Sequence, residues 1–159
     1  MNIKKLLLTL IFLSCLFRSN FQGQQQSYFS FELAGSGGLA SFNYEHLVLD
    51  KPILDLHIRY GFSLIPIDKN NGVNLIFPIM LHSIIGKTDH KLDLAIGQAI
   101  SFTTKGSFFI SAPLALGYRY QPLEKKYFLR ISYTPLLSYL IDIQLQNWAG
   151  ITFGYNFKQ

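Results

Sequence analysis

The chain has 159 residues, of which 49% are hydrophobic, 15% are aromatic and only 14% are charged. A soluble domain carries roughly 25% charged residues, so this sequence lacks the charge that usually covers a water-facing surface. Lys4, Lys5 and Arg18 supply part of the formal net charge of +5, and without them 11 Lys and Arg stand against 9 Asp and Glu. Because this balance leaves no dense basic surface, we expect no nucleic-acid partner.

Residues 1–23 are predicted to be a cleaved export signal, followed by one domain over residues 24–159. Two lysines precede a mostly apolar run at 6–17, which is shorter than the roughly 20 residues that a membrane-spanning helix needs. Cys15 leaves attachment of a lipid anchor open as an alternative to cleavage near Gly23. A chain without a spanning helix can cross a membrane only as a closed β-barrel.

Apolar and polar residues alternate with a period of two along most of this domain, as in strands with one face in a different solvent from the other. Between Leu54 and Leu64, for example, every second residue is apolar, with Asp55, His57 and Arg59 on the opposite face. Residue types typical of turns separate successive segments at intervals of about a dozen residues. The pattern predicts eight strands, at 27–35, 38–47, 53–65, 73–85, 91–102, 108–121, 127–136 and 147–157, with 137–146 open between loop and strand.

An even number of strands predicts an antiparallel up-and-down barrel with both ends on the periplasmic side of a bacterial outer membrane. We expect an all-β, eight-stranded transmembrane barrel whose lumen is filled by side chains, which argues against a porin. The chain order then predicts external connections at 66–72, 103–107 and 137–146, and periplasmic connections at 48–52, 86–90 and 122–126.

An alternative is a soluble, lipocalin-like barrel that would bind a small apolar ligand in the periplasm. The two barrels differ in what their apolar faces contact, which is lipid in a membrane barrel and the interior in a soluble one. The apolar faces carry no charged residue, which a lipid-facing surface requires. The opposite faces are rich in small residues such as Ala99, Gly117 and Gly150, while most lysines lie in predicted turns. A narrow lumen suits small residues and a water-covered exterior does not, so the pattern favours the membrane.

Aromatic residues near the strand ends are expected to form girdles at the two membrane interfaces. The residues concerned are Tyr28, Tyr60, Phe62, Phe102, Phe108, Tyr118, Tyr120, Tyr127, Tyr155 and Phe157.

Four sequence blocks, at 31–45, 116–122, 128–135 and 148–157, resemble small, mostly uncharacterised outer-membrane β-barrel proteins of Bacteroidetes-type bacteria. The resemblance covers nearly all of the domain and implies a place in the outer membrane, with membrane lipid and the outer-membrane assembly machinery as partners. It implies no agreed activity. Such chains usually finish on an aromatic residue that the machinery reads, whereas two further residues follow Phe157 here.

Charged residues on the inward faces form the candidate site. Because buried charges must be paired and Arg offers a fork for carboxylates, we expect the acids to form a ladder of ion pairs with the arginines. The predicted lumen polar cluster consists of Glu32, Asp55, His57, Arg59, Asp93, Arg119 and Arg130.

The function predicted from the sequence is a structural or envelope-interaction role without catalysis, cofactor or metal, in a monomer. The four histidines lack metal-ligand spacing. A lipid-modifying enzyme, such as a lipid A deacylase or acyltransferase, stays an alternative, although His82 and Ser83 are adjacent in a strand and point to opposite faces, so they cannot act as a pair.

Overall fold

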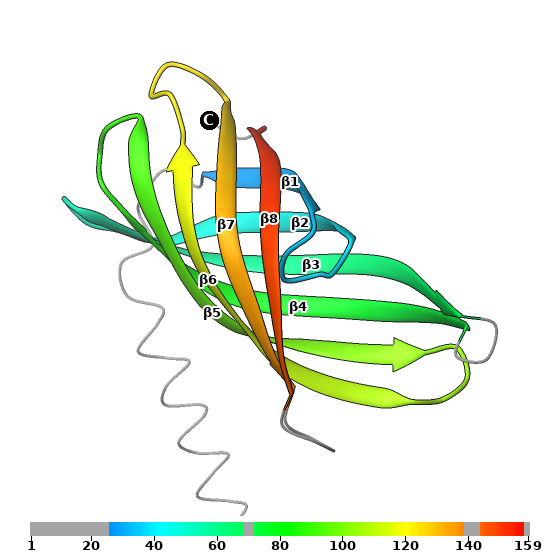
Figure 1. Ribbon diagram of the computed structural model, residues 1–159. Coiled ribbons are helices and arrows are strands. Elements are labelled where there is room, and N and C mark those ends of the chain that lie inside the picture. The colour runs from blue at the N-terminus through cyan, green and yellow to red at the C-terminus, as the bar shows by residue number, and fades with distance from the viewer. Residues whose placement is uncertain (1–25, 69–71, 139–143, 158–159) are drawn as a thin grey trace, which may run out of the picture.

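A computed structural model describes residues 26–68, 72–138 and 144–157 (Figure 1), and the predicted export signal at 1–23 lies outside this described part. All eight predicted strands are confirmed. They are β1 (Ser27–Leu33), β2 (Ala40–Asp50), β3 (Leu54–Asp68), β4 (Gly72–Ile85), β5 (His90–Thr103), β6 (Phe108–Tyr120), β7 (Tyr127–Ser138) and β8 (Gln144–Asn156). No helix in the described part is long and apolar enough to cross a membrane.

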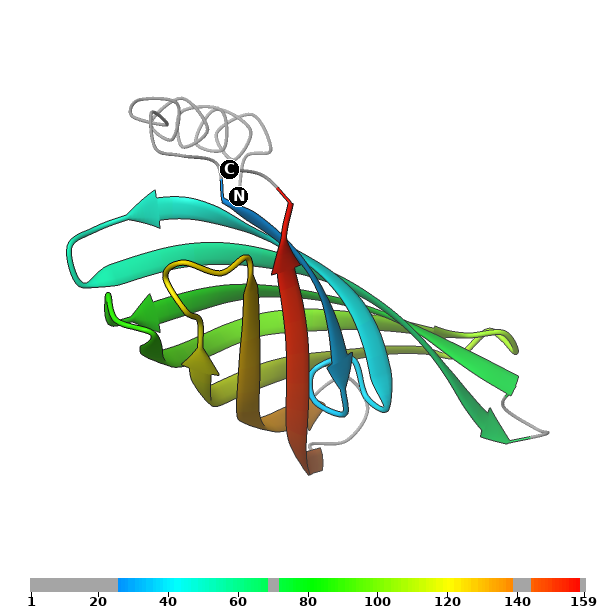
Figure 2. The same ribbon diagram turned by 90° about the horizontal axis from the view of Figure 1, so that it is seen from above.

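Each strand pairs with its neighbours in the chain, and β1 also pairs with β8, so that the sheet closes into an antiparallel barrel. Figure 2 shows this closure from above, with β1 and β8 side by side. Tyr28 at the start of β1 lies opposite Asn156 at the end of β8, so the barrel begins and finishes at the same end. We call this the termini end, which also holds the β2–β3, β4–β5 and β6–β7 connections. The opposite end is the loop end.

The connections at the termini end are short, and the sequence suits them. Gly86 follows β4 with a φ of 115°, a conformation that side-chain-bearing residues rarely adopt, and its N–H donates to the carbonyl of Ile53 at 2.9 Å. At the loop end, Gly106 has a φ of 93° in the β5–β6 turn. These glycines lie in the turns that were predicted to separate the strands. The segment 137–146 contains the end of β7 and the start of β8, and residues 139–143 lie outside the described part.

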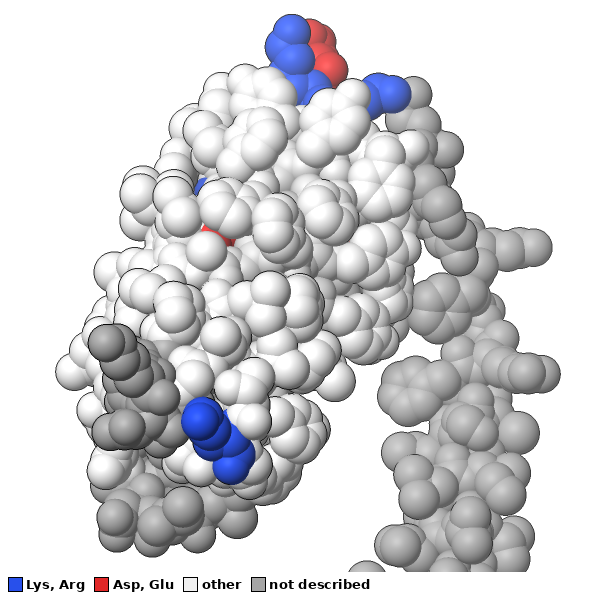
Figure 3. Space-filling view, turned by 90° about the vertical axis from the view of Figure 1, so that its right-hand side faces the viewer, with Lys and Arg blue, Asp and Glu red and all other residues white. Residues whose placement is uncertain are grey.

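The outer surface of the barrel is apolar. Ile151 is 58% exposed and Phe153 is 52% exposed on β8, and Ile131 beside them on β7 is 61% exposed. Figure 3 shows one face that is almost entirely uncharged, with charged side chains at its two ends and only small red and blue patches between them. A soluble lipocalin-like barrel needs the reverse arrangement, with apolar side chains packed inside. The structure therefore does not support that alternative.

The interior is polar and charged over the half of the lumen nearer the termini end. The largest completely buried side chains include Arg59, Arg119 and Arg130, together with Glu32 and Glu45. Inward residues alternate with outward residues over most of β5 and over the second half of β8, as the period-two pattern predicts. The core of this protein is thus a charged cluster inside an apolar shell.

The expected aromatic girdles differ from the structure at Tyr28, which does not belong to the outer surface. Most of the aromatic residues expected there are exposed on the outer face, including Tyr60, Tyr118 and Tyr155. Tyr28, however, is 2% exposed and lies inside the barrel, with its ring 5.4 Å from that of Phe128 in a T-shaped arrangement. The reason is its parity in β1, where Tyr28 shares the inward face with Glu32 while Phe29 points outward.

Candidate functional site

The buried charges form one connected group at the middle of the lumen and toward the termini end. Its members come from seven strands, because each strand of a barrel contributes inward side chains at the same level. We define the lumen cluster as the side chains Glu32 (β1), Glu45 (β2), His57 and Arg59 (β3), His82 (β4), Asp93 (β5), Arg119 (β6) and Arg130 (β7).

Glu32 joins two arginines on opposite sides of the barrel. Its Oε1 lies 3.2 Å from Arg59 Nη1 and 3.7 Å from Arg130 Nη2. Its other oxygen, Oε2, accepts hydrogen bonds from the hydroxyls of Ser36 at 3.0 Å and Ser41 at 3.3 Å. With both oxygens occupied, the buried carboxylate has the partners that burial requires.

Glu45 is the second acid at the centre of the cluster. Arg119 Nη1 donates to its Oε1 at 2.6 Å, and His57 Nδ1 lies 3.0 Å from the same oxygen. Arg130 Nη1 lies 3.7 Å from Oε2. Since Glu45 and Arg119 are both completely buried, this pair is isolated from the screening that weakens surface ion pairs.

Asp93 forms a third centre with a histidine. His82 Nδ1 lies 2.7 Å from Asp93 Oδ1, and Arg130 Nη1 donates to Asp93 Oδ2 at 3.0 Å. Arg119 Nη1 is 4.0 Å from the same oxygen. Arg130 therefore contacts Glu32, Glu45 and Asp93 at once, and it connects the three acids into a single network.

Aromatic rings close the cluster on the side of the termini end. The guanidinium carbon of Arg119 lies 3.6 Å from the centre of the Phe128 ring and 5.0 Å from that of Tyr28. The Tyr28 hydroxyl accepts a hydrogen bond from the Gln121 amide at 2.7 Å. Stacking on ring faces suits Arg in particular, because its planar cation is weakly hydrated.

Of the seven residues predicted for this site, six lie in the cluster and Asp55 does not. Asp55 sits on β3 nearer the termini end, where its Oδ1 is 2.5 Å from Nζ of Lys87 in the β4–β5 turn. The same amine lies 2.7 Å from Asp50. The expectation that Asp55 pairs with an arginine is therefore wrong. Its ion-pair partner in the structure is Lys87, from the adjacent β4–β5 turn.

Sequence reasoning missed two members, Glu45 and His82. Glu45 could have been found, because Ser41 and Asn43 precede it on the same face of β2. His82 gave little signal, since its inward neighbours on β4 are the apolar Met80 and Ile84. Within the described ranges, no group of three or more His, Cys, Asp or Glu side chains is arranged to hold a metal ion.

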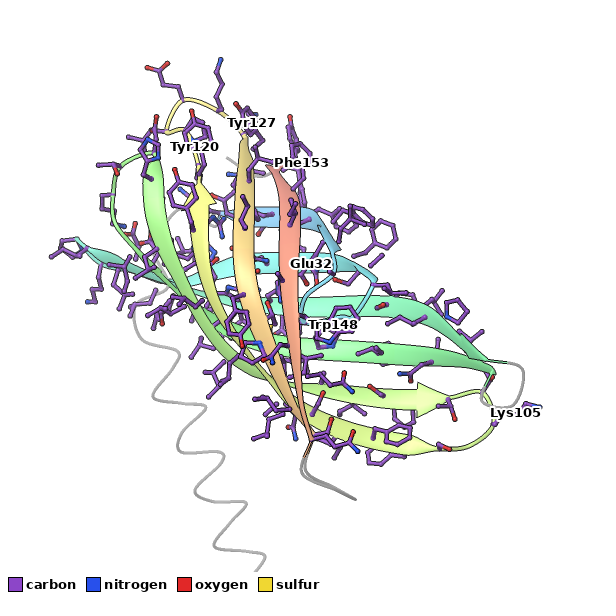
Figure 4. The ribbon with its side chains drawn as sticks, in the orientation of Figure 1. Glu32, Lys105, Tyr120, Tyr127, Trp148 and Phe153 are labelled. Carbon is purple, nitrogen blue, oxygen red and sulfur yellow. The ribbon has the colours of Figure 1, made fainter. Side chains whose placement is uncertain are left out.

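The half of the lumen nearer the loop end is not filled, which corrects the expectation of a lumen filled throughout. It contains a cavity of about 480 Å³. The lining comes from the β1–β2 connection and from β3 to β8: Ser36, Gly38, Ile65, Asn74, Ile76, Ser101, Phe109, Ile110, Ser111, Leu136, Ser138, Gln144, Gln146 and Trp148. Figure 4 labels Glu32 in the cluster, Trp148 beside the cavity, and Tyr120 and Tyr127 at the termini end.

No protein family and no curated protein matches the sequence. Among solved structures, the outer membrane protein Ail of Yersinia pestis, determined in a phospholipid bilayer nanodisc, is similar with a TM-score of 0.55. Sequence identity is 13%, and the match covers 84% of this chain and 100% of Ail. The de novo designed protein TMB2.3 matches with a TM-score of 0.47 at 13% identity, over 88% of this chain and 100% of the design. The closed barrel of eight antiparallel strands and its likeness to Ail show that the chain has the fold of an eight-stranded outer-membrane barrel.

Proposed function

We propose that this protein is an integral barrel of a bacterial outer membrane with a structural or envelope-interaction role. One observation carries the proposal: the apolar side chains face outward all around the barrel, and the charges are inside or at the two ends. In water such a surface would be an aggregation hazard, whereas in a bilayer it meets the hydrocarbon. The fold of Ail and the sequence blocks that resemble Bacteroidetes-type barrels support the same placement.

The lumen cluster supports a role without passive diffusion. Arg59, Arg119 and Arg130 lie across the lumen and are held by three carboxylates, so they close it between the cavity and the termini end. A solute that crossed the barrel would have to break buried ion pairs, each costly to separate. The protein is therefore proposed as a plugged barrel in place of a channel.

The arrangement of His82 supports a role without catalysis. In the described part of the chain, its hydrogen-bond partners are Asp93 and Arg130, and the ring is 1% exposed. A hydrolase would need a nucleophile within hydrogen-bond reach of this base and access for the substrate. We propose that the His82–Asp93 pair fills and neutralises the lumen.

Cell fractionation tests the placement. The full chain, expressed in a Gram-negative host, should sediment with the outer membrane and resist extraction by carbonate. Its gel mobility should differ between boiled and unboiled samples, as for a folded barrel. Release by osmotic shock without detergent would contradict the proposal.

Paired cysteine substitutions test the orientation. Lys105 lies in the β5–β6 turn at the loop end, and Lys125 in the β6–β7 connection at the termini end. With a membrane-impermeant maleimide, Lys105→Cys should be labelled on intact cells and Lys125→Cys only after permeabilisation, with the unsubstituted chain as the blank. The reverse labelling pattern would overturn the orientation.

Lipid A analysis tests the absence of catalysis. The mass pattern of lipid A should be the same in cells that express the chain, in cells that lack it, and in cells with His82→Gln. A change in acylation that appears with the chain and disappears in a folded His82→Gln variant would establish the lipid-modifying alternative instead.

A further inference from the structure

The cavity at the loop end has a lining that differs from the rest of the lumen, since none of its side chains carries a charge. Hydroxyls and amides that both donate and accept hydrogen bonds project from the β1–β2 connection and from five strands, β4 to β8. They belong to Ser36, Asn74, Ser101, Ser111, Ser138, Gln144 and Gln146.

Flat and aliphatic surfaces lie between these polar groups. The rings of Trp148 and Phe109 line the cavity together with Ile65, Ile76 and Leu136. The Trp148 indole N–H donates to the side-chain oxygen of Gln146 at 3.5 Å, so an amide flanks the larger ring. The volume of about 480 Å³ lies within the range of pockets that hold small molecules.

The lining determines which class of ligand can bind, because both the ligand and the lining lose their hydration on binding. A charged ligand would lose its hydration and find no opposite charge in the lining, which is costly. A purely apolar ligand would cover hydroxyls and amides and leave them unpaired, at a cost for each group. A neutral ring with hydroxyls on its edge and C–H groups on its faces satisfies both kinds of surface. We propose that this cavity binds a neutral sugar unit, either of a free saccharide or of a glycan chain.

The floor of the cavity lies on the side of the lumen cluster. Ser36 lines the cavity and also donates to Glu32 at 3.0 Å, and it accepts a hydrogen bond from Arg59. The floor is thus attached to the lumen cluster, which blocks passage toward the termini end. A sugar enters and leaves through the loop end, and the orientation proposed above places that end outside the cell.

Trp148 is the single tryptophan of the chain, so its fluorescence reports on this site alone. The purified full chain should be placed in phospholipid vesicles, which add no tryptophan and, unlike alkyl-glycoside detergents, no sugar. Glucose, galactose, maltose and sucrose are the neutral probes, and dextran represents a glycan chain. Glucuronate represents a charged ligand, and cyclohexane represents a purely apolar one. We expect a saturable change in fluorescence with at least one neutral saccharide and none with glucuronate or cyclohexane.

Two matched amide substitutions assign the response to the cavity. Asn74→Leu removes a lining amide at similar volume and should weaken saccharide binding about tenfold. Gln98→Leu makes the corresponding change on the outer face of β5 and should leave binding unchanged. Calorimetry confirms the result independently of fluorescence, and heat-dependent gel mobility confirms that each variant is folded.

The outcomes separate clearly. Tighter binding of dextran than of the small saccharides assigns the site to a glycan chain, and the opposite order assigns it to a free saccharide. Failure of every saccharide probe, saturable binding of cyclohexane or glucuronate, or equal effects of the two amide variants would overturn the inference. Because binding is measured on purified protein, its failure leaves the fractionation result for the proposed function untouched.

Discussion

The guanidinium group of Arg119 lies between the carboxylate of Glu45, 2.6 Å from Oε1, and the face of the Phe128 ring, 3.6 Å from its centre. One side of the cation is therefore neutralised and the other is covered by a ring. All three side chains are completely buried. The charge of Arg119 at the centre of this barrel depends on partners from two other strands, β2 and β7, so we expect its removal to disturb contacts across the lumen.

Replacement of Arg119 by methionine should destabilise the barrel strongly. The substitution keeps much of the volume but leaves Glu45 with Arg130 at 3.7 Å and His57 as its remaining partners. Removal of one member of a buried ion pair costs about 3–5 kcal/mol. Urea unfolding in lipid vesicles, followed by tryptophan fluorescence, measures this loss.

The double substitution Arg119→Met with Glu45→Gln is the control. If the loss comes from an unpaired buried charge, the double variant should be more stable than Arg119→Met alone, because the charge has gone as well. Lys125→Met, in the β6–β7 connection, should change the free energy of unfolding by less than about 0.5 kcal/mol. A double variant no more stable than Arg119→Met would show that the loss is one of packing.

Gly154 is complementary in shape to Phe128, and a methyl group there should be costly. The two residues lie opposite each other on β8 and β7, and a Cβ on Gly154 would overlap the Phe128 ring. Overpacking of a closely packed core costs about 1–3 kcal/mol. Gly154→Ala should therefore lower the urea midpoint, and Phe128→Leu in the same chain should restore part of the loss. No recovery in the double variant would contradict the steric explanation.

The strands were predictable because the two faces of each strand meet different surroundings. The outer face is apolar, and the inner face is polar over much of the lumen. Where the inward face is polar, as at Arg130 and Thr152, the alternation is sharp, and the predicted strands agree with the structure to within a few residues. It is blurred in β2 by a register shift between Leu47 and Leu49, which inserts an extra residue. In β4 it is blurred because Met80 and Ile84 are apolar on the inward face as well.

The candidate site was predictable only in part. Periodicity shows which face a residue occupies, but it does not show how far along the barrel axis that residue lies or which turn reaches it. Asp55 therefore appeared equivalent to Asp93, although Lys87 of the adjacent turn pairs with it. The cavity was missed for a related reason. Small inward residues such as Ser101 and Ser111 suit a narrow filled lumen and an open cavity equally well.

The triad of Lys87, Asp50 and Asp55 predicts a loss of stability at high pH. Burial lowers the pKa of Lys87, but its hydrogen bonds to Asp50 and Asp55 outweigh burial and raise the pKa above the ordinary value of 10.5. The folded state therefore holds this proton more tightly than the unfolded state does. The contribution to stability is complete below pH 10.5 and disappears as the pH rises through the raised pKa.

A comparison with Lys87→Met isolates this effect from other titrations. At about pH 8 the unsubstituted chain should be more stable, by no more than about 1 kcal/mol since the amine is partly exposed and screened by solvent. Lys91, which lies near the same carboxylates, is present in both chains. The difference in urea midpoint should narrow toward about pH 12. A difference that is constant over this range would contradict the assignment.

A charge placed on the outer face distinguishes a lipid surface from a water surface. Ile151, on the apolar outer face of β8, and Leu123, in the β6–β7 connection, are both more than half exposed in the structure. If acyl chains cover Ile151, Ile151→Arg should lose about 2–4 kcal/mol of folding free energy in vesicles, while Leu123→Arg should be nearly neutral because it stays in water. Were water to cover both positions, both substitutions would be close to neutral, since surface changes of this kind rarely exceed about 0.5 kcal/mol. The difference between the two variants therefore measures directly which solvent surrounds the barrel at Ile151.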